Sequence, residues 1–239
     1  MPVDGASVGL LVADSFLVHD GRVVAPARHR ERFLRDADAQ GIVHPPRAFL
    51  EFAWSSLPRA GSWFPRIDMT ERGELELWVR PAPALTRTVS VWTTTSDPRT
   101  SPGIKGPDIP ALGNLRDQAI AAHATEAVMV SASGEVLDGA TTCLMWWRDG
   151  VLCVQPPGME RVDSVTIRVV RDMATEEGVT VRETTAVLAE IAPGETWAVN
   201  ALHGIRGVSA WMPDQGAASI DDDRLDAWRR RYAERFEEL

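Results

Sequence analysis

The pattern of apolar and polar positions predicts a mixture of strands and helices. Alternation with a period of two is typical of strands, and apolar residues three or four apart are typical of helices. The predicted strands are 8–18, 75–79, 88–94, 127–130, 134–138, 179–181, 196–199 and 207–211, with hairpins at Asp20-Gly21 and over 142–154. The predicted helices are 28–40, 46–57, 111–123, 165–177 and a last one opened by Asp221, with Phe236 in its apolar stripe. Without a strict strand–helix–strand rhythm, this mixture predicts an α+β fold with mixed sheets and flanking helices.

A proline-rich segment, Pro81-Ala-Pro83, follows the strand predicted at 75–79. Proline ends strands and stiffens linkers, so this segment is the expected domain boundary. The chain of 239 residues is long enough for two domains. We therefore predict a small N-terminal α+β domain over 1–84 and a larger C-terminal domain over 85–239.

Composition narrows the class of protein. Apolar residues make up 44% of the chain and charged residues 25%, which is typical of a soluble globular protein. The net charge of −9 argues against nucleic acid and anionic membranes as partners. No apolar run approaches the roughly 20 residues of a membrane-spanning helix, and no basic cluster opens the chain. These features predict a cytoplasmic protein.

The chain lacks the motifs of several common enzyme classes. Its five histidines have no metal-ligand spacing, and neither a phosphate loop nor a Gly-x-Ser-x-Gly motif is present. A two-residue turn at Asp149-Gly150 would pair Cys153 with Trp146 rather than with Cys143, so we expect both cysteines to be reduced. Zinc hydrolases, nucleotide-binding proteins and serine hydrolases are therefore disfavoured.

Lys105 is the only lysine among 25 basic residues. An amine, unlike a guanidinium, can lose its proton near neutral pH and attack a carbonyl. Burial among the apolar residues around it would favour the neutral amine. These neighbours are Pro102, Ile104, Pro107 and Ile109. The alternative is a surface lysine that persists by chance in an arginine-rich chain.

Six short motifs follow one another in order along the chain. They are His29-Arg-Glu-Arg32-Phe, Lys105 placed 21 residues before Glu126-Ala-Val, Gly134-Glu-Val-Leu-Asp138-Gly, Trp147-Arg-Asp-Gly-Val-Leu with Pro156-Pro157, Val162-Asp-Ser-Val-Thr166, and Glu195-Thr-Trp-Ala-Val-Asn200-Ala-Leu. Over about residues 14–213, their order and spacing resemble the class IV pyridoxal-phosphate enzymes. This family includes branched-chain and D-amino-acid aminotransferases and aminodeoxychorismate lyase.

The resemblance implies a two-domain fold type IV architecture with pyridoxal 5'-phosphate as cofactor. Lys105 would be the catalytic residue, forming a Schiff base with the cofactor and then acting as general base. Asp138 would keep the pyridine nitrogen protonated, and Arg32 with the start of a helix would hold the phosphate. The implied cofactor-binding residues are Arg32, Asp138, Ser164, Val165, Thr166, Ala201 and Leu202.

The implied activity is transfer of an amino group between an amino acid and a 2-keto acid. A lyase of the aminodeoxychorismate type is the close alternative, because both reactions use Lys105 as base and diverge only afterwards. The third alternative is a family member that keeps the fold but does not catalyse the reaction. It is motivated by departures from the family pattern, which are Asp138 for Glu, Cys143 for Asn, Ser164 for Gly, Ile167 for Arg and the altered segment 11–14.

Simpler interpretations stand beside these roles. Arg32 could be an exposed helix arginine, 138–139 only a turn, and Ser164 with Thr166 an ordinary helix cap. His203 either lines the site or is a buried histidine whose hydrogen bonds are satisfied.

The expected partners are a small-molecule amino acid or keto acid and a second copy of the chain. The resemblance implies a homodimer, and nine tryptophans exceed the need of one small core. We therefore expect exposed tryptophans at an interface.

Overall fold

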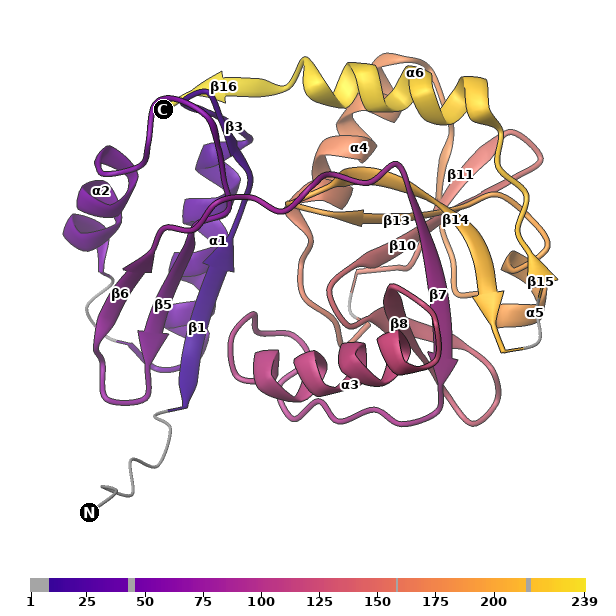
Figure 1. Cartoon of the computed structure of the whole chain (residues 1–239), viewed down its shortest axis with the longest axis horizontal. Helices are drawn as coiled ribbons and strands as arrows, with labels where there is room; N and C mark the ends of the chain where they lie inside the picture. Colours follow the sequence, from indigo (N-terminus) through magenta and orange to yellow (C-terminus); the bar gives the residue numbers. More distant parts are fainter. Residues whose placement is uncertain (1–8, 43–45, 158, 214–215) are drawn as a thin grey trace.

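The described residues form three sheets (Figure 1). The computed structural model describes residues 9–42, 46–157, 159–213 and 216–239. An antiparallel three-stranded sheet has the order β1 (Leu10–Ser15), β5 (Arg66–Thr70), β6 (Leu75–Trp78). An antiparallel four-stranded sheet has the order β16 (Phe236–Glu238), β3 (Arg22–Val24), β2 (Val18–His19), β4 (Ser62–Trp63). The last strand of the chain thus completes a sheet made of early residues.

The third sheet has nine strands and mixed pairing. Its order is β12 (Val181–Glu183), β11 (Val151–Val154), β10 (Cys143–Arg148), β13 (Thr196–Asn200), β14 (Gly204–Met212), β7 (Thr88–Thr94), β8 (Glu126–Val130), β9 (Val136–Gly139), with β15 (Gly216–Ala217) beside β14. The pairs β11–β12, β14–β7 and β7–β8 are parallel and the others antiparallel. The predicted α+β class with mixed sheets is confirmed.

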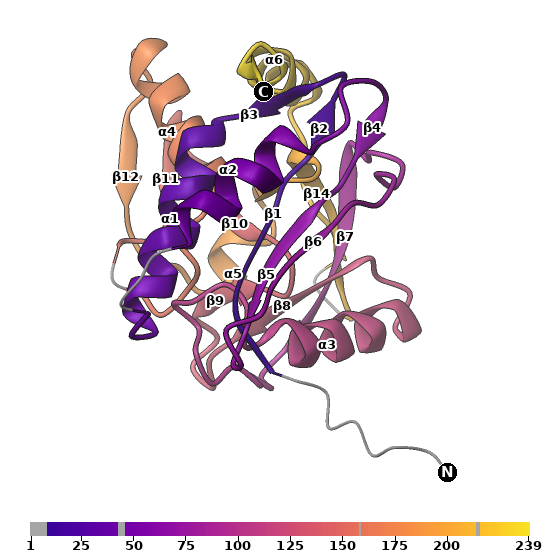
Figure 2. The ribbon, with the colours of Figure 1, turned by 90° about the vertical axis from the view of Figure 1, so that its left-hand side faces the viewer.

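In the part of the chain that the structure describes, six helices flank the sheets. They are α1 (Pro26–Ala39), α2 (Arg47–Ser55), α3 (Ile109–Ala121), α4 (Val165–Glu176), α5 (Leu188–Ile191) and α6 (Asp222–Ala233). Helices α4 and α6 pack on β10, β11 and β13, and α3 packs on β8 (Figure 1). Figure 2 shows α1 of the early part beside α4, and these two helices are in contact. The start of α4 therefore lies where the early and late parts of the chain meet.

Most predicted elements are present within a few residues of the expected bounds. The hairpin over 142–154 has Asp149 and Gly150 at φ 52° and 75°, and Trp146 pairs with Cys153 as expected. Both cysteines are free and buried. Within the described ranges, no helix combines the length and the apolar character needed to cross a bilayer. The domain division at residue 84 stays a prediction.

Two expectations at the ends of the chain were wrong. The strand predicted at 8–18 is two strands, because β1 ends at Ser15 and pairs with β5, while only β2 forms the hairpin with β3. Val8 lies outside the described residues. Phe236 does not continue the last helix, because α6 ends at Ala233 and Phe236 pairs with Val24 in β16.

The expectation of exposed tryptophans was also wrong. Five of the nine are buried, namely Trp54, Trp146, Trp197, Trp211 and Trp228. Trp197 and Trp228 pack with Trp147, with ring centroids 5.3–5.7 Å apart. Trp78 is the large exception, with 53% of its surface exposed. The tryptophans mainly fill the cores, so their number gives no support for an interface.

Candidate functional site

Lys105 lies in the segment between β7 and α3, which is laid against β1. The Ala13 N–H donates to the Lys105 carbonyl at 2.6 Å, and the Lys105 N–H donates to Asp36 Oδ2 at 3.3 Å. The next residue, Gly106, has φ 151°, and a Cβ there would lie 2.8 Å from Val12 Cα. The close approach of two backbones therefore requires a glycine after Lys105. These contacts fix the lysine between β1 and α1.

The surroundings of Lys105 favour its neutral amine. The residue is half-buried. Burial lowers the pKa of Lys105, and the Arg32 guanidinium lowers it further, while Asp14 and Cys143 act in the opposite direction. A lowered pKa makes the amine available as a nucleophile or base closer to neutral pH.

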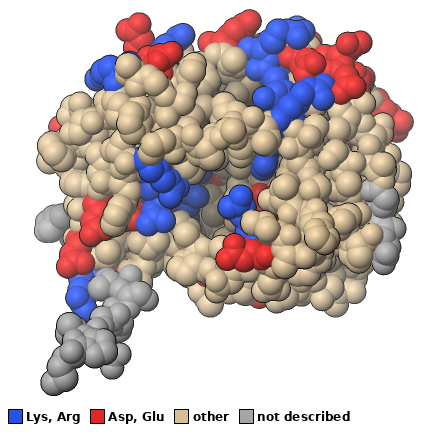
Figure 3. Space-filling model, viewed as in Figure 1, with Lys and Arg blue, Asp and Glu red and all other residues tan. Residues whose placement is uncertain are grey.

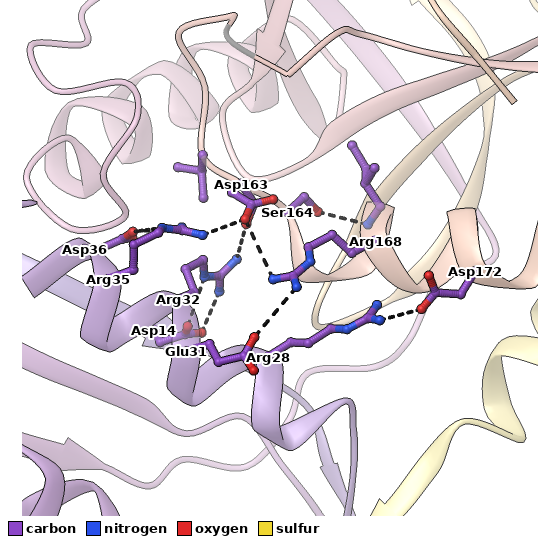
Figure 4. Close-up of polar contacts among 12 residues, drawn as sticks. Asp14, Arg28, Glu31, Arg32, Arg35, Asp36, Asp163, Ser164, Arg168 and Asp172 are labelled. Atoms are coloured by element: carbon purple, nitrogen blue, oxygen red, sulfur yellow. Dashed lines mark hydrogen bonds and ion pairs between the residues drawn. The ribbon is translucent and has the colours of Figure 1, made fainter.

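Arg32 is part of a buried cluster with Asp14 and His29. Its Nε donates to Asp14 Oδ2 at 3.0 Å and its Nη2 to Oδ1 at 2.6 Å (Figure 4). His29 Nδ1 lies 2.9 Å from Asp14 Oδ1. Burial alone would raise the pKa of Asp14, but Arg32 and His29 hold it far below its usual range. Arg32 is only 4% exposed, so its interpretation as an exposed helix arginine was wrong.

Ion pairs join α1 to α4 around this cluster (Figure 4). Arg35 contacts Asp163 at 2.6 Å, and Arg28 contacts Asp172 at 2.5 Å. Arg32 Nη1 also donates to the Asp163 carbonyl at 3.3 Å. Arg32 therefore faces the beginning of α4, with part of its guanidinium still unused by Asp14.

The beginning of α4 offers backbone donors. Ser164 is the N-cap, and its hydroxyl accepts the Ile167 N–H at 3.3 Å, so the cap interpretation of Ser164 is confirmed. Val165 and Thr166 are buried and open the helix. Their N–H groups have no partner within the helix, and the positive end of the helix dipole favours an anion. A phosphate-binding role for these residues stays a prediction.

Asp138 is a buried carboxylate with an unused oxygen. It lies in strand β9, so the interpretation of 138–139 as only a turn was wrong. Its side chain is 6% exposed, and its Oδ1 has no hydrogen-bond partner among the described residues. Burial raises the pKa of Asp138 to about 6, although Arg161 and Arg99 oppose this effect. Such an oxygen is suited to accept a hydrogen bond from a protonated ring nitrogen.

Cys143 is a buried thiol on β10, which contacts the strand β9 that carries Asp138. Burial raises the pKa of Cys143 well above its usual range, and the Asp138 carboxylate adds to this effect. The thiol therefore stays protonated and can donate to Asp138.

The turn between β13 and β14 is held by Asn200. Its Oδ1 accepts the N–H groups of Leu202 at 3.1 Å and His203 at 2.8 Å. The Ala201 carbonyl accepts the Leu17 N–H at 3.0 Å, which ties the turn to the early part of the chain. Contact of Ala201 and Leu202 with the cofactor stays a prediction.

The structure thus adds Asp14, Arg99 and Arg161, which the motifs did not indicate. Asp14 holds Arg32 and is also hydrogen-bonded to His29 of the first motif, while Arg99 and Arg161 act on Asp138. Asp14 stands within the apolar segment 8–18, and an acidic residue in such a segment was the one available signal. Arg99 and Arg161 are two among many arginines, so the sequence did not distinguish them.

Comparison with known proteins places the chain in a family. The family model for class IV amino-transferases matches residues 11–211. The chain belongs to this family. Members of the class IV family depend on pyridoxal phosphate, so this cofactor, expected from the motifs, is confirmed at the level of the family. No curated protein matches the chain in sequence.

Solved structures share the fold. The pyridoxal-phosphate-bound form of a hypothetical aminotransferase from Mycobacterium tuberculosis has 18% identity and a TM-score of 0.79, with 97% of this chain and 93% of that chain covered. A putative 4-amino-4-deoxychorismate lyase from Legionella pneumophila has 15% identity and a TM-score of 0.82, with coverages of 98% and 96%. The Escherichia coli branched-chain aminotransferase has 16% identity and a TM-score of 0.74, with coverages of 93% and 84%. The fold type IV architecture is confirmed, and it is shared by proteins described as having different activities.

The residues present fit the family's cofactor. The unpartnered Asp138 Oδ1 matches a protonated pyridine nitrogen, and the start of α4 beside Arg32 matches a phosphate. Lys105 offers the amine that would bind the aldehyde. Figure 3 shows a hollow between the early part and the large sheet, with Lys and Arg side chains at its edge.

Proposed function

We propose that the chain is a pyridoxal-phosphate-dependent aminotransferase in which Lys105 is the catalytic residue. The observation that carries the proposal is the setting of the single lysine. Its backbone is hydrogen-bonded to Ala13 of β1 and Asp36 of α1, and burial together with the Arg32 guanidinium lowers the pKa of its amine. Arg32 also donates to the Asp163 carbonyl at the start of α4, so a helix start suited to an anion lies on the same arginine.

Each residue of the site has a role that its chemistry allows. When bound, pyridoxal phosphate supplies an electron sink for negative charge at the substrate α-carbon. Asp138 would hold the proton on the pyridine nitrogen, and its Oδ1 has no hydrogen-bond partner among the described residues. The N–H groups of Val165 and Thr166, together with Arg32, would hold the phosphate.

Lys105 would perform the proton transfers. Its neutral Nζ would take a proton from the substrate α-carbon and return one to the carbon of the cofactor's former aldehyde group. Hydrolysis by water then releases the 2-keto acid and leaves the amino group on the cofactor, and the reverse steps pass this group to a second keto acid. This outcome needs one base that also acts as acid. A lyase additionally needs a donor for its leaving group, so transamination makes fewer demands on the described residues.

A carbon–oxygen lyase is the second candidate. The observation in its favour is the turn Asn200-Ala-Leu, whose form resembles the lyase branch and whose asparagine holds the turn through two hydrogen bonds. The site residues up to the α-carbon are the same in both reactions. A test must therefore separate the products.

The decisive assay supplies the loaded protein with a panel of amino acids and a 2-keto acid. We expect amino transfer that requires the keto acid and disappears in Lys105→Arg, because a guanidinium stays protonated. Pyruvate release from aminodeoxychorismate without any keto-acid-dependent turnover would replace this proposal by the lyase. Absence of both reactions, with no spectral response to amino acids, would favour a non-catalytic member.

The assembly is a further part of the proposal. The family resemblance supports a homodimer that acts on a small-molecule amino acid or keto acid, and the composition of the sequence supports a cytoplasmic location. Light scattering should then give twice the chain mass of 26.2 kDa. A monomer mass at micromolar concentration would contradict the dimer.

A further inference from the structure

Gln155 follows strand β11 and reaches across to strand β9, which carries Asp138. Its Nε2 donates to the Val136 carbonyl at 2.7 Å and to the Leu137 carbonyl at 2.8 Å. Gln155 is only 1% exposed. Because a carbonyl oxygen can only accept, the amide must point its nitrogen at these two residues. One buried side chain thus holds the two residues that directly precede Asp138.

The two carbonyls belong to a bulge in an edge strand. β9 is the last strand of the nine-stranded sheet and lies beside β8 (Figure 2). Val136 and Asp138 pair with consecutive residues of β8, so Leu137 is an extra residue in β9. Such a bulge bends the strand and changes the direction of the side chains next to it. The bulge therefore helps to decide where the Asp138 side chain points.

A primary amide matches this bulge. In a regular strand the carbonyls of successive residues point to opposite sides, whereas those of Val136 and Leu137 both point toward Gln155. An amide nitrogen carries two N–H donors, and a hydroxyl carries only one. Since β9 is an edge strand of the described sheet, the amide takes the place of a neighbouring strand at this point.

The other half of the same amide is unused. Gln155 Oε1 is buried and has no hydrogen-bond partner among the described residues. A buried acceptor without a partner destabilises a protein, so an apolar side chain of the same size would fill this space at less cost. The position of Gln155 is therefore explained by what its nitrogen holds.

The backbone of Gln155 is anchored by Arg161. Arg161 Nη2 donates to the Gln155 carbonyl at 3.2 Å, and Nη1 donates to the Val162 carbonyl at 3.2 Å. The arginine thus ties the end of β11 to the segment that leads into α4. Through Gln155, strand β9 is connected to the segment that ends at Ser164.

The position of β9 sets the position of the Asp138 carboxylate. An aspartate has a single methylene between its backbone and its carboxylate, so the side chain has little reach with which to compensate for a displaced strand. Its Oδ1, which has no hydrogen-bond partner among the described residues, is the atom suited to the pyridine nitrogen. A charge-assisted hydrogen bond of this kind needs a separation of about 2.7–2.9 Å.

We propose that Gln155 is a positioning residue for Asp138. Its amide holds the bulge in β9 and so fixes Oδ1 where the pyridine nitrogen of the bound cofactor meets it. This inference rests on the role proposed above for Asp138. It does not depend on whether the reaction is transamination or elimination, because both use the same carboxylate.

The test compares two ligands of the cofactor-free protein by quenching of tryptophan fluorescence. One is pyridoxal phosphate, and the other is its analogue with a C–H group in place of the ring nitrogen. Both carry the aldehyde and the phosphate, but only pyridoxal phosphate can form a hydrogen bond with Asp138. We expect the wild-type protein to prefer pyridoxal phosphate at least about tenfold, and Asp138→Ala to lose most of this preference.

Gln155→Met keeps the length of the side chain and removes the amide. It should lower the preference at least about threefold, while the affinity for the analogue changes by no more than about twofold. Gln118→Met, at an exposed position of α3, is the matched control and should leave both affinities unchanged. An equal loss of affinity for both ligands, or an unchanged preference, would overturn the proposal.

Hydrogen exchange of the cofactor-free protein tests the hold on β9 directly. Peptides that cover residues 134–142 should exchange faster in Gln155→Met than in the wild type, and unchanged exchange would overturn the proposal. Thermal unfolding checks that the variants are folded. Gln155→Asn keeps the amide but is one methylene shorter, so it should shift the preference in the same direction and carries the test if Gln155→Met does not fold.

The outcomes separate this proposal from the one on which it rests. A wild-type protein without any preference for pyridoxal phosphate would contradict the role of Asp138, and the role of Gln155 with it. A preference that Asp138→Ala removes and Gln155→Met retains would contradict the role of Gln155 alone.

Discussion

Asp138→Asn should make the protein without cofactor more stable while it damages the site. The folded chain buries this carboxylate, whose Oδ1 has no hydrogen-bond partner among the described residues, and the pKa of Asp138 rises from its ordinary 3.8 to about 6. Since a change of one in pKa corresponds to about 1.36 kcal/mol, this difference corresponds to roughly 3 kcal/mol. This energy difference already includes the attraction between the Asp138 carboxylate and the guanidinium groups of Arg161 and Arg99. Replacing the carboxylate by a neutral amide should recover about 1–3 kcal/mol above pH 6.

The sign of the pH dependence isolates this residue. Because the folded pKa is raised, the folded state binds the Asp138 proton more tightly than the unfolded state does. The free energy of unfolding therefore falls as pH rises from about 4 to about 6, and the full cost is present above that range. In Asp138→Asn this contribution disappears. The difference between the two proteins should then grow from near zero at low pH to its full value at neutral pH.

Urea-induced unfolding of the protein without cofactor, followed by tryptophan fluorescence from pH 4.5 to pH 8, measures the effect. Asp38→Asn, at an exposed position of α1, is the matched control and should change the free energy of unfolding by no more than about 0.5 kcal/mol. The loaded Asp138→Asn protein should show slower proton removal at the substrate α-carbon. A destabilised Asp138→Asn protein, or a difference that does not vary with pH, would refute the reasoning.

Two further predictions concern the support of the site. Asp14→Asn removes the buried partner of two basic side chains and should cost about 3–5 kcal/mol in urea unfolding, whereas Asp172→Asn, at a half-exposed ion pair, should cost at most about 1 kcal/mol. Because the pKa of Asp14 is lowered, its contribution to the free energy of unfolding should be complete above about pH 4 and lost as pH falls further. Equal costs for Asp14→Asn and Asp172→Asn would contradict the buried pairing. Gly106→Ala should destabilise the chain by about 1–3 kcal/mol, because its Cβ would lie 2.8 Å from Val12 Cα. The control is Gly113→Ala in α3, where a Cβ meets open space, and it should be neutral or stabilising by up to about 1 kcal/mol. Thermal melts of both glycine variants check this, and an unchanged midpoint for Gly106→Ala would show that β1 can move away.

The sequence predicted the regular elements better than their pairing. Strand 88–94 and helix 165–177 have strong local patterns and are present almost as expected. The pairing of β1 with β5 and of β16 with β3 joins distant segments, and local periodicity carries no information on such partners. Phe236 fitted a helical stripe, but pairing with β3 placed it in a strand instead.

The same limit applies to the site. The motifs indicated Lys105 and Asp138 because their order in the chain is distinctive. The role of Asp14 depends on Arg32 and His29 reaching it from another element, which a one-dimensional pattern does not contain. The effect of the Asp138 carboxylate on the pKa of Cys143 depends in the same way on the contact between strands β9 and β10.

The most direct test of the account is chemical trapping at Lys105. The protein is saturated with pyridoxal phosphate, reduced with borohydride, digested and analysed by tandem mass spectrometry. Lys105 carries the only side-chain primary amine, so the reduced cofactor should be attached to the peptide that contains it, and Lys105→Arg should take up none there. The α-amino group of Met1 is the one competing amine, and its peptide is separate. An unmodified Lys105 peptide from protein that was saturated with cofactor would contradict the central claim.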